Sequence, residues 1–211
     1  MKKIHVFDFD GTLVDSMQYF SQGMLDVVKK LGVSYPDDII NIITPLGYQK
    51  TAEYFVNVLG AKEKLENIHR MMGESLVYQY TYNVKHKPYV KEYLQKLKDQ
   101  GCRLFVLTAS PHLVLDVCME RNGIADYFEK LWSTDDFGIN KAGTELFYKL
   151  AERIGCDTQD IAFYDDNVTA IKNSRKSGME AVAVYDPSND AYIDEIKASC
   201  DIFVDNYFEL L

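Results

Sequence analysis

The stretch that most constrains the fold of this chain lies near its start, at Val6-Phe7-Asp8-Phe9-Asp10-Gly11-Thr12. An apolar run from Ile4 to Phe9 ends in two carboxylates and a Gly-Thr turn, which is typical of a buried parallel strand whose carboxyl end opens into a loop. Side chains two residues apart on a strand share a face, so we expect Asp8 and Asp10 to project together. Two carboxylates this close need a cation or a shared proton. The stretch therefore predicts an α/β protein with an acidic site at the end of its first strand.

Length, composition and charge limit the possible partners of the chain. Its 211 residues, of which 47% are hydrophobic, suit one α/β domain with an insertion, or two small domains, around a sizeable core. The net charge of -9 argues against nucleic acid or an anionic membrane as the main partner. An anionic substrate would therefore need a local phosphate site, made by a metal ion, a lysine and backbone amides.

Cysteine spacing and the lengths of apolar runs indicate the compartment. The four cysteines show no Cys-x-x-Cys or zinc-site spacing, which is typical of reduced thiols. The apolar run after Lys2-Lys3 is broken too early by Asp8 and Asp10 for a signal peptide, and no stretch approaches the length of a membrane span. We expect a cytoplasmic protein without a membrane partner, and the sequence leaves open whether it is a monomer or a dimer.

Residues 16–85 differ in character from the rest of the chain, because their apolar side chains recur at helical spacing. Helices are expected at 19–31, 52–59 and 62–82. The tyrosines of 77–82 would also fit an alternating strand, but we favour a helix there. The sequence therefore predicts an α-helical domain at 16–85, inserted into an α/β domain formed by residues 1–15 and 86–211.

From Lys87 onward, apolar runs of strand length alternate with helical patterns. Strands are expected at 102–108, 130–133, 160–167, 180–185 and 201–204, and helices at 88–100 and 144–154. Strands that alternate with helices are typical of a parallel sheet. Together with the first strand, they predict a Rossmann-like parallel sheet flanked by helices.

The strand that ends at Thr108 leads into a second feature suited to phosphate. We expect Ser110 to be the N-cap and Pro111 the first residue of the next helix, so that Thr108 and the amide of Ala109 lie just before a helix N-terminus. Helix N-termini are favourable places for phosphoryl oxygens. A purely structural cap would explain the same residues equally well.

These features occur in the order found in a known superfamily. Residues 7–16, Phe-Asp-Phe-Asp-Gly-Thr-Leu-Val-Asp-Ser, resemble the first motif of the haloacid dehalogenase-like hydrolase superfamily, in the form found in its phosphatases and phosphomutases. Thr108, at the end of an apolar strand, resembles the threonine of the second motif. Lys141 stands where the family keeps a lysine before a helix, and Asp165-Asp166 resemble the paired aspartates of the fourth motif. The resemblance covers essentially the whole chain. It implies that residues 16–85 form a helical cap on a Rossmann-like catalytic core.

The resemblance also implies roles for the residues of the site. Asp8 would be the nucleophile that forms an aspartyl-phosphate, and Asp10 would be the general acid and base. Thr108, the amide of Ala109 and Lys141 would bind the oxygens of the phosphoryl group.

Mg²⁺ is the implied cofactor, because it prefers oxygen ligands and keeps some of its waters. The resemblance implies that the ion is bound by the Asp8 carboxylate, the backbone carbonyl of Asp10 and Asp165, with Asp166 as a further candidate ligand. The sequence leaves open whether Asp166 binds the ion directly. Many members add Asp or Asn four residues after the first of the pair, where this chain has Thr169.

The chain departs from the family pattern after Lys141. Members usually have a proline directly after this lysine and another two residues later, where this chain has Ala142 and Thr144. A solvated surface lysine is therefore the alternative to a phosphate-binding role for Lys141.

The implied function is hydrolysis of a small phosphorylated metabolite by a Mg²⁺-dependent phosphatase related to phosphoglycolate phosphatase. Asp10 argues against dehalogenating relatives, which do not keep this residue. A sugar phosphomutase of the β-phosphoglucomutase type would share all four motifs. A member that has lost turnover, and that binds a phosphometabolite or serves a regulatory role, is the other alternative.

Substrate selection is expected to come from the helical segment. The predicted turn Thr44-Pro45-Leu46-Gly47 and the residues after it provide the candidate contacts Gly47, Tyr48 and Lys50. No pattern in the sequence identifies the substrate itself.

Overall fold

The computed structural model describes residues 2–43 and 46–211, so Thr44 and Pro45 of the predicted turn lie outside the described residues. The chain divides into two compact units. Unit 1 consists of Met1–Asp15 and Lys85–Leu211, and unit 2 of Ser16–Val84. The roles of catalytic core and cap stay predictions for these units. Within the described ranges, no helix combines the length and the apolar character needed to cross a membrane.

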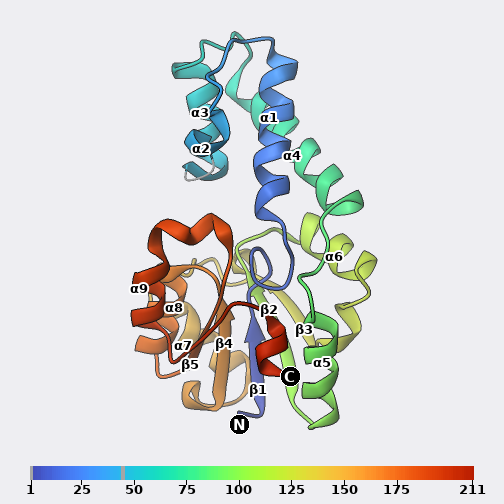
Figure 1. Ribbon diagram of the computed structural model, residues 1–211, viewed down its shortest axis with the longest axis vertical. Helices are drawn as coiled ribbons and strands as arrows, with labels where there is room; N and C mark the ends of the chain where they lie inside the picture. The colour runs from blue at the N-terminus through green and yellow to red at the C-terminus, as the bar shows by residue number, and fades with distance from the viewer. Residues whose placement is uncertain (1, 44–45) are drawn as a thin grey trace. The chain divides into compact units, whose positions relative to one another are not determined.

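Unit 1 is built on one parallel sheet (Figure 1). Its strands are β1 (Ile4–Phe7), β2 (Arg103–Thr108), β3 (Lys130–Ser133), β4 (Ile161–Asp165), β5 (Glu180–Val184) and β6 (Ile202–Val204). The strand order is β3-β2-β1-β4-β5-β6, and all neighbours are parallel. This is the order of Rossmann-like folds, and it confirms the predicted fold class.

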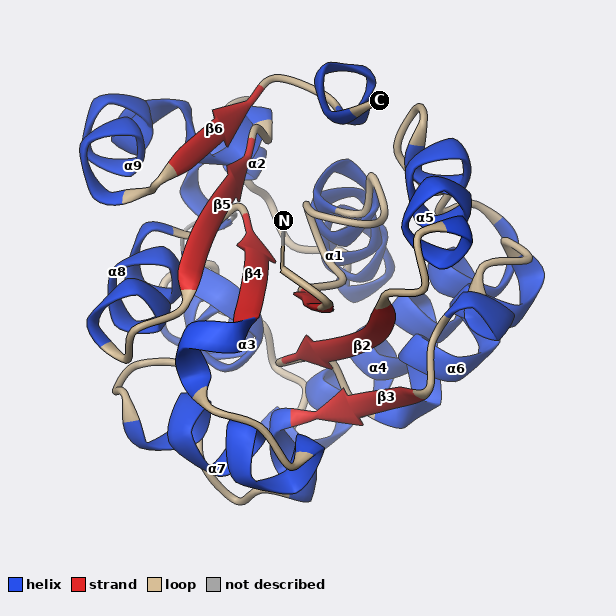
Figure 2. Ribbon diagram, turned by 90° about the horizontal axis from the view of Figure 1, so that it is seen from below, coloured by secondary structure: helices blue, strands red, loops and turns tan. Residues whose placement is uncertain are grey.

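Helices cover both faces of this sheet (Figure 2). They are α5 (Val90–Asp99), α6 (His112–Arg121), α7 (Glu145–Ile154), α8 (Val168–Lys176) and α9 (Ile193–Ser199). The short 3-10 helices are η2 (Ala125–Tyr127), η3 (Thr134–Asp136), η4 (Thr158–Asp160), η5 (Pro187–Tyr192) and η6 (Tyr207–Leu210). α5 and α6 lie on one face, and α7, α8 and α9 on the other. The central strands are therefore buried on both faces, which explains their nearly continuous apolar sequences.

Unit 2 is helical. Its helices are α1 (Met17–Leu31), α2 (Ile39–Ile43), α3 (Gly47–Asn57) and α4 (Leu65–Tyr82). They share one apolar core, to which Val27, Ile43, Phe55 and Met72 each contribute a fully buried side chain. Residues 77–82 belong to α4, so the preference for a helix over a strand is confirmed.

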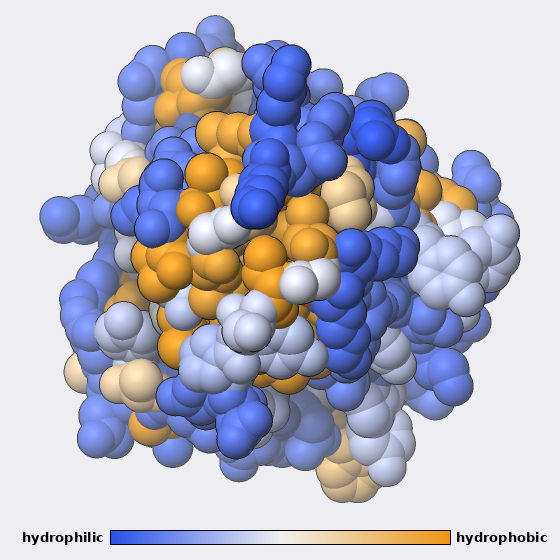
Figure 3. Space-filling model, turned by 90° about the horizontal axis from the view of Figure 1, so that it is seen from above, coloured by the Kyte–Doolittle hydropathy of each residue, from blue (hydrophilic) through white to orange (hydrophobic). Residues whose placement is uncertain are grey.

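Figure 3 shows one face of the molecule on which apolar side chains gather among hydrophilic ones.

The helix after β2 begins one residue later than predicted. Pro111, with a ψ angle of 154°, is the N-cap, and α6 starts at His112. Ser110 makes other hydrogen bonds: its hydroxyl donates to Asp10 Oδ2 (2.5 Å) and its amide donates to Thr108 Oγ1 (3.0 Å). The prediction of Ser110 as the N-cap is therefore wrong.

A buried polar chain joins β1 to β4. His5 Nε2 lies 3.0 Å from the carbonyl oxygen of Lys2, which can only accept, so Nε2 carries the proton. The Tyr164 hydroxyl therefore donates to His5 Nδ1 (2.9 Å) and accepts from the Tyr93 hydroxyl (2.7 Å). Burial lowers the pKa of His5 from 6.5 to about 4, so its ring is neutral in the folded protein near neutral pH.

The packing of the core cluster that contains Leu150 and Trp132 can be tested with two matched leucine substitutions. Leu150 of α7 is fully buried, whereas Leu113 of α6 is 68% exposed. We expect Leu150→Ala to lower the free energy of unfolding by about 2–5 kcal/mol, and Leu113→Ala to lower it by less than about 0.5 kcal/mol. Urea denaturation followed by the fluorescence of Trp132, the single tryptophan, reports the difference, because Trp132 lies in the same core cluster as Leu150. Equal effects of the two substitutions would contradict this packing.

The neutral state of His5 predicts a pH dependence of stability. The unfolded chain takes up a proton on His5 below its ordinary pKa of 6.5, whereas the folded protein does so only near 4, so stability is lost as pH falls between these values. From about pH 7 to about pH 5, we expect the wild type to lose about 2 kcal/mol more than His5→Asn, which cannot titrate. Urea denaturation at the two pH values measures this. The carboxylates titrate in both proteins, so their contribution to the pH dependence cancels in the comparison. Equal losses of stability in the wild type and in His5→Asn would contradict a buried neutral imidazole.

Candidate active site

The acidic residues of the site follow the two central strands. β1 pairs with β4 so that Phe7 lies opposite Tyr164, and the amide of Asp8 donates to the carbonyl of Tyr164 (2.8 Å). Asp8 directly follows β1, and Asp165 is the last residue of β4. The strand order reverses at this pair of strands, which is where open parallel sheets form ligand sites. The register therefore places Asp8 beside Asp165.

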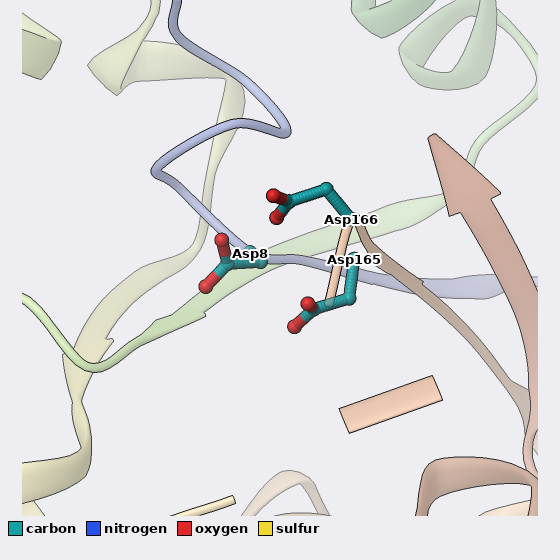
Figure 4. A group of neighbouring side chains, drawn as sticks. All are labelled: Asp8, Asp165 and Asp166. Atoms are coloured by element: carbon teal, nitrogen blue, oxygen red, sulfur yellow. The ribbon is translucent and has the colours of Figure 1, made fainter. Parts of the chain in front are cut away.

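Asp8, Asp165 and Asp166 form a group of three carboxylates whose side chains converge (Figure 4). Each residue contributes one oxygen, and these oxygens lie within 4.8 Å of one another. All three residues are buried. The carboxylate of Asp10 lies outside this group, and β1 ends at Phe7, before both Asp8 and Asp10.

Lys141 supplies positive charge to this group from the loop before α7. Its ammonium donates to Asp8 Oδ1 and to Asp165 Oδ2, the latter at 2.8 Å. The side chain is 13% exposed, and its Nζ lies 5.4 Å from the centroid of the Phe163 ring. The backbone carbonyl of Lys141 accepts from the Asn173 side chain (3.0 Å). Lys141 is therefore held at the acidic group and is not a solvated surface lysine, although prolines do not follow it.

Burial and repulsion dominate the electrostatics of the group. Burial raises the pKa of Asp8 to about 8, although Lys141 lowers it. Burial also raises the pKa of Asp166 well above its usual value, and the charges of Asp165 and Asp8 add to this shift. Burial lowers the pKa of Lys141, but the Asp165 and Asp8 carboxylates raise it more, so the ammonium stays charged. The group therefore carries excess negative charge when all of its carboxylates are ionised.

Two of the predicted phosphate-binding residues, Thr108 and Ala109, lie at the end of β2. Thr108 is the last residue of β2 and is buried, whereas Ala109 is exposed in the bend that follows. Ser110 connects this bend to the first motif through its contacts with the Thr108 hydroxyl and the Asp10 carboxylate. The contact between Ser110 and Asp10 was not predicted, and the position of Ser110 two residues after Thr108 was the one signal for it in the sequence.

Asp166 is held by residues that sequence analysis also missed. The Thr12 hydroxyl donates to Asp166 Oδ1 (3.3 Å), and the Asn189 amide donates to Oδ2 (2.7 Å). Gly11 has a φ of +71°, and a Cβ at this position would lie 2.4 Å from Asp166 Oδ2. Glycine is therefore required for two reasons, the left-handed backbone and the close approach of the carboxylate.

The donor set fits a divalent cation such as Mg²⁺. Three converging carboxylates offer oxygen ligands only, which hard cations prefer. Burial, together with repulsion from neighbouring carboxylates, raises the pKa values of Asp8 and Asp166, and a bound cation would favour their ionised forms. Asp8, Asp165 and Asp166 are thus the side chains able to hold such an ion, and a contribution from the Asp10 carbonyl stays a prediction.

The candidate substrate contacts lie in α3 of unit 2, which begins at Gly47. The Tyr48 hydroxyl donates to the carbonyl of His69, and the two rings stack with their centroids 5.5 Å apart. Tyr48 is thus engaged within unit 2, whereas Lys50 is exposed. The role of Gly47, Tyr48 and Lys50 in specificity stays a prediction.

Several proteins similar to this chain carry the names of phosphatases. The chain is 21% identical over 177 residues to the phosphorylated carbohydrates phosphatase of Thermotoga maritima, a match that covers 84% of this chain and 82% of that protein. It is 23% identical to hexitol phosphatase B of Escherichia coli, over 97% of this chain and 92% of that protein. The crystal structure of CbbY from Rhodobacter sphaeroides in complex with phosphate superposes with a TM-score of 0.80 and 18% identity, over 100% of this chain and 96% of that chain.

A match at the level of the family extends over most of the chain. The likeness to the solved structure shows the shared fold. The sequence profile described as haloacid dehalogenase-like hydrolase matches residues 5–184, a range that includes Asp8, Lys141 and the Asp165-Asp166 pair. The chain therefore belongs to the haloacid dehalogenase-like hydrolase family.

Proposed function

We propose that this protein is a phosphatase that hydrolyses a small phosphorylated metabolite through a phosphoryl group carried by Asp8. The observation that carries the proposal is the contact of the Lys141 ammonium with both Asp8 and Asp165, beside the third buried carboxylate, Asp166. Relatives named for phosphorylated carbohydrates and for hexitol support a sugar or sugar-alcohol phosphate as the class of substrate.

The first half of the reaction makes one bond and breaks another at phosphorus. An Asp8 oxygen attacks the phosphorus atom, and the bond to the oxygen of the leaving group breaks. The Lys141 ammonium lies where it offsets the repulsion between the Asp8 carboxylate and an anionic substrate. Thr108, at the end of β2, and the amide of Ala109 are the proposed contacts for the remaining phosphoryl oxygens.

Asp10 is the proposed proton carrier. Its carboxyl group protonates the leaving oxygen, and the resulting carboxylate then takes a proton from the water that attacks the phosphoryl group on Asp8. The Ser110 hydroxyl donates to Asp10 Oδ2 and so orients this carboxyl group. Asp8 is released as a carboxylate when inorganic phosphate forms, which restores the site.

Mg²⁺ is the proposed cofactor. Asp8, Asp165 and Asp166 would hold it, and it would supply positive charge that screens the phosphate from these carboxylates. Unit 2 is the proposed cap, with Gly47, Tyr48 and Lys50 as candidate contacts for the part of the substrate beyond its phosphate.

Two alternatives use the same residues. A sugar phosphomutase of the β-phosphoglucomutase type would transfer the phosphoryl group from Asp8 to a sugar hydroxyl instead of to water. A member without turnover would bind a phosphometabolite or act in regulation. Both differ from the phosphatase in their products, so a single set of assays separates the three.

Removal of the proposed nucleophile should abolish hydrolysis. We expect the wild type to release phosphate from sugar phosphates, hexitol phosphates, phosphoglycolate or an aryl phosphate in the presence of Mg²⁺, and Asp8→Asn to lower the rate by roughly 10⁴-fold or more, because the amide cannot attack phosphorus. Asp126→Asn, which changes an exposed aspartate in η2, should retain the wild-type rate. A phosphate-release assay with both variants measures this.

The products decide between the alternatives. Isomerisation of a hexose 1-phosphate to the 6-phosphate, with little phosphate released, would show that the protein is a phosphomutase and not a phosphatase. A wild type that binds a phosphometabolite without converting it would favour the inactive member. Hydrolysis that survives in Asp8→Asn would refute Asp8 as the nucleophile.

Cation binding should stabilise the protein more at higher pH. Because burial raises the pKa of Asp8 to about 8, the metal-free folded protein holds a proton there that the unfolded chain releases near its ordinary value of 3.8, and stability falls as pH rises between the two. Mg²⁺ needs the deprotonated group, so its stabilising effect should increase from about pH 6 to about pH 8, reaching about 2.7 kcal/mol at 100 times Kd. Thermal melting with Mg²⁺ or chelator measures it, with Asp165→Asn as the control that loses the effect. A melting temperature insensitive to Mg²⁺ at every pH would contradict a cation site.

A further inference from the structure

The loop after β5 lies beside the acidic group, although it lies outside the range, residues 5–184, that the family profile matches. This loop contains Asp186 and η5, which begins at Pro187. Its Asn189 reaches the acidic group and donates to Asp166 Oδ2 at 2.7 Å. None of the roles proposed above uses this loop.

Asn189 and Thr12 are two neutral side chains that donate hydrogen bonds to the Asp166 carboxylate. The Thr12 hydroxyl donates to the other carboxylate oxygen, Oδ1 (3.3 Å), and the backbone of Gly11 approaches too closely for any Cβ. The carboxylate thus has one donor on each oxygen and one side closed by backbone. Rotation about its side-chain torsions would break at least one of these contacts.

The loop itself is anchored by a buried ion pair. Lys87 Nζ lies 2.9 Å from Asp186 Oδ2, and these side chains are 12% and 2% exposed. Lys87 also donates to the Tyr185 carbonyl (2.7 Å), and Asp186 Oδ1 accepts from the amide and the hydroxyl of Ser188. These contacts restrain the backbone on the N-terminal side of Asn189, so the amide is presented to Asp166 from a fixed position.

We propose that Asn189 is a positioning residue that orients the Asp166 carboxylate for a divalent cation. The proposal rests on the proposed function, in which Asp166 is one of the side chains that hold Mg²⁺. Asn189 acts through Asp166 and has no contact of its own with the reacting atoms.

The chemistry of the side chain suits this role. A primary amide donates a hydrogen bond that favours the charged carboxylate, yet it adds no positive charge that would compete with a cation. Each oxygen of Asp166 accepts one hydrogen bond from these neighbours, and a carboxylate oxygen has capacity for a further contact. A lysine in place of Asn189 would instead neutralise Asp166 and displace the cation.

Direct metal titration of Asn189→Ala tests the proposal. We expect the Kd for Mn²⁺, measured by isothermal titration calorimetry on the full chain, to rise by about 10–100-fold, which is the usual cost of removing a residue that orients a ligand. The Mg²⁺ concentration for half-maximal phosphatase activity should rise to a similar extent, while kcat at saturating Mg²⁺ stays within about threefold of the wild type.

Asp190→Asn is the matched control, because it changes the next residue of the same loop. Asp190 is exposed and accepts from the Tyr185 hydroxyl (2.9 Å), a contact that an asparagine oxygen can also accept. This variant removes one negative charge and should leave the Kd for Mn²⁺ within about twofold of the wild type. An equal loss in both variants would show a general effect of the loop and would overturn the assignment to Asn189.

A second variant keeps the proposal testable if Asn189→Ala does not fold, as judged by Trp132 fluorescence. Asn189→Ser is small and polar but too short to reproduce the amide contact, so we expect it also to bind Mn²⁺ more weakly than the wild type. Wild-type affinity in a folded variant overturns the proposal. Absence of Mn²⁺ binding in the wild type would instead refute the proposed cation site, so the two failures are distinguishable.

Discussion

The compensation of buried negative charge at the ends of β1 and β4 is the constraint on which the site depends. Three carboxylates converge there, and the Lys141 ammonium contacts Asp8 and Asp165. Their repulsion would separate them on a flexible loop, so the position of each must be fixed by its neighbours. Strand pairing fixes Asp8 and Asp165, and neutral donors fix Asp166. A rigid parallel sheet is suited to this task, because paired backbones resist the movement that would relieve the repulsion.

The fold could be predicted from the sequence because its signals are local. Apolar runs that end in polar residues mark the strands leading to Asp8, Thr108 and Asp165, and helical spacing marks α1, α3 and α4 of unit 2 but not the short α2. The ends of the elements were less accurate. The first strand, expected to reach Phe9, ends at Phe7, and Gly11 with φ of +71° then turns the chain. The turn at Gly11 was expected, but propensity and spacing do not identify the residue at which the strand before it ends.

The candidate site was predictable where a residue ends or directly follows a strand, or stands before a helix. Asp165 and Lys141 are of this kind, and the structure brings their side chains together. The contact between Ser110 and Asp10 joins residues 100 positions apart, and the one between Asn189 and Asp166 starts from a loop with no motif. Such contacts depend on how the folded backbones approach one another, and neither periodicity nor spacing records that approach. The orienting residues of a site are therefore harder to read from a sequence than its ligands.

The strand order also has a consequence for the way in which unit 1 forms. β1 comes first in the chain but occupies the middle of the sheet, where Ile4 pairs with Arg103 on one side and with Ile161 on the other. During synthesis, β1 therefore emerges with two unpaired edges long before either partner exists, and such edges favour wrong pairing. Pairings between residues so distant in sequence also fold slowly. The acidic group therefore cannot assemble until β4 has been made, although Asp8 directly follows β1.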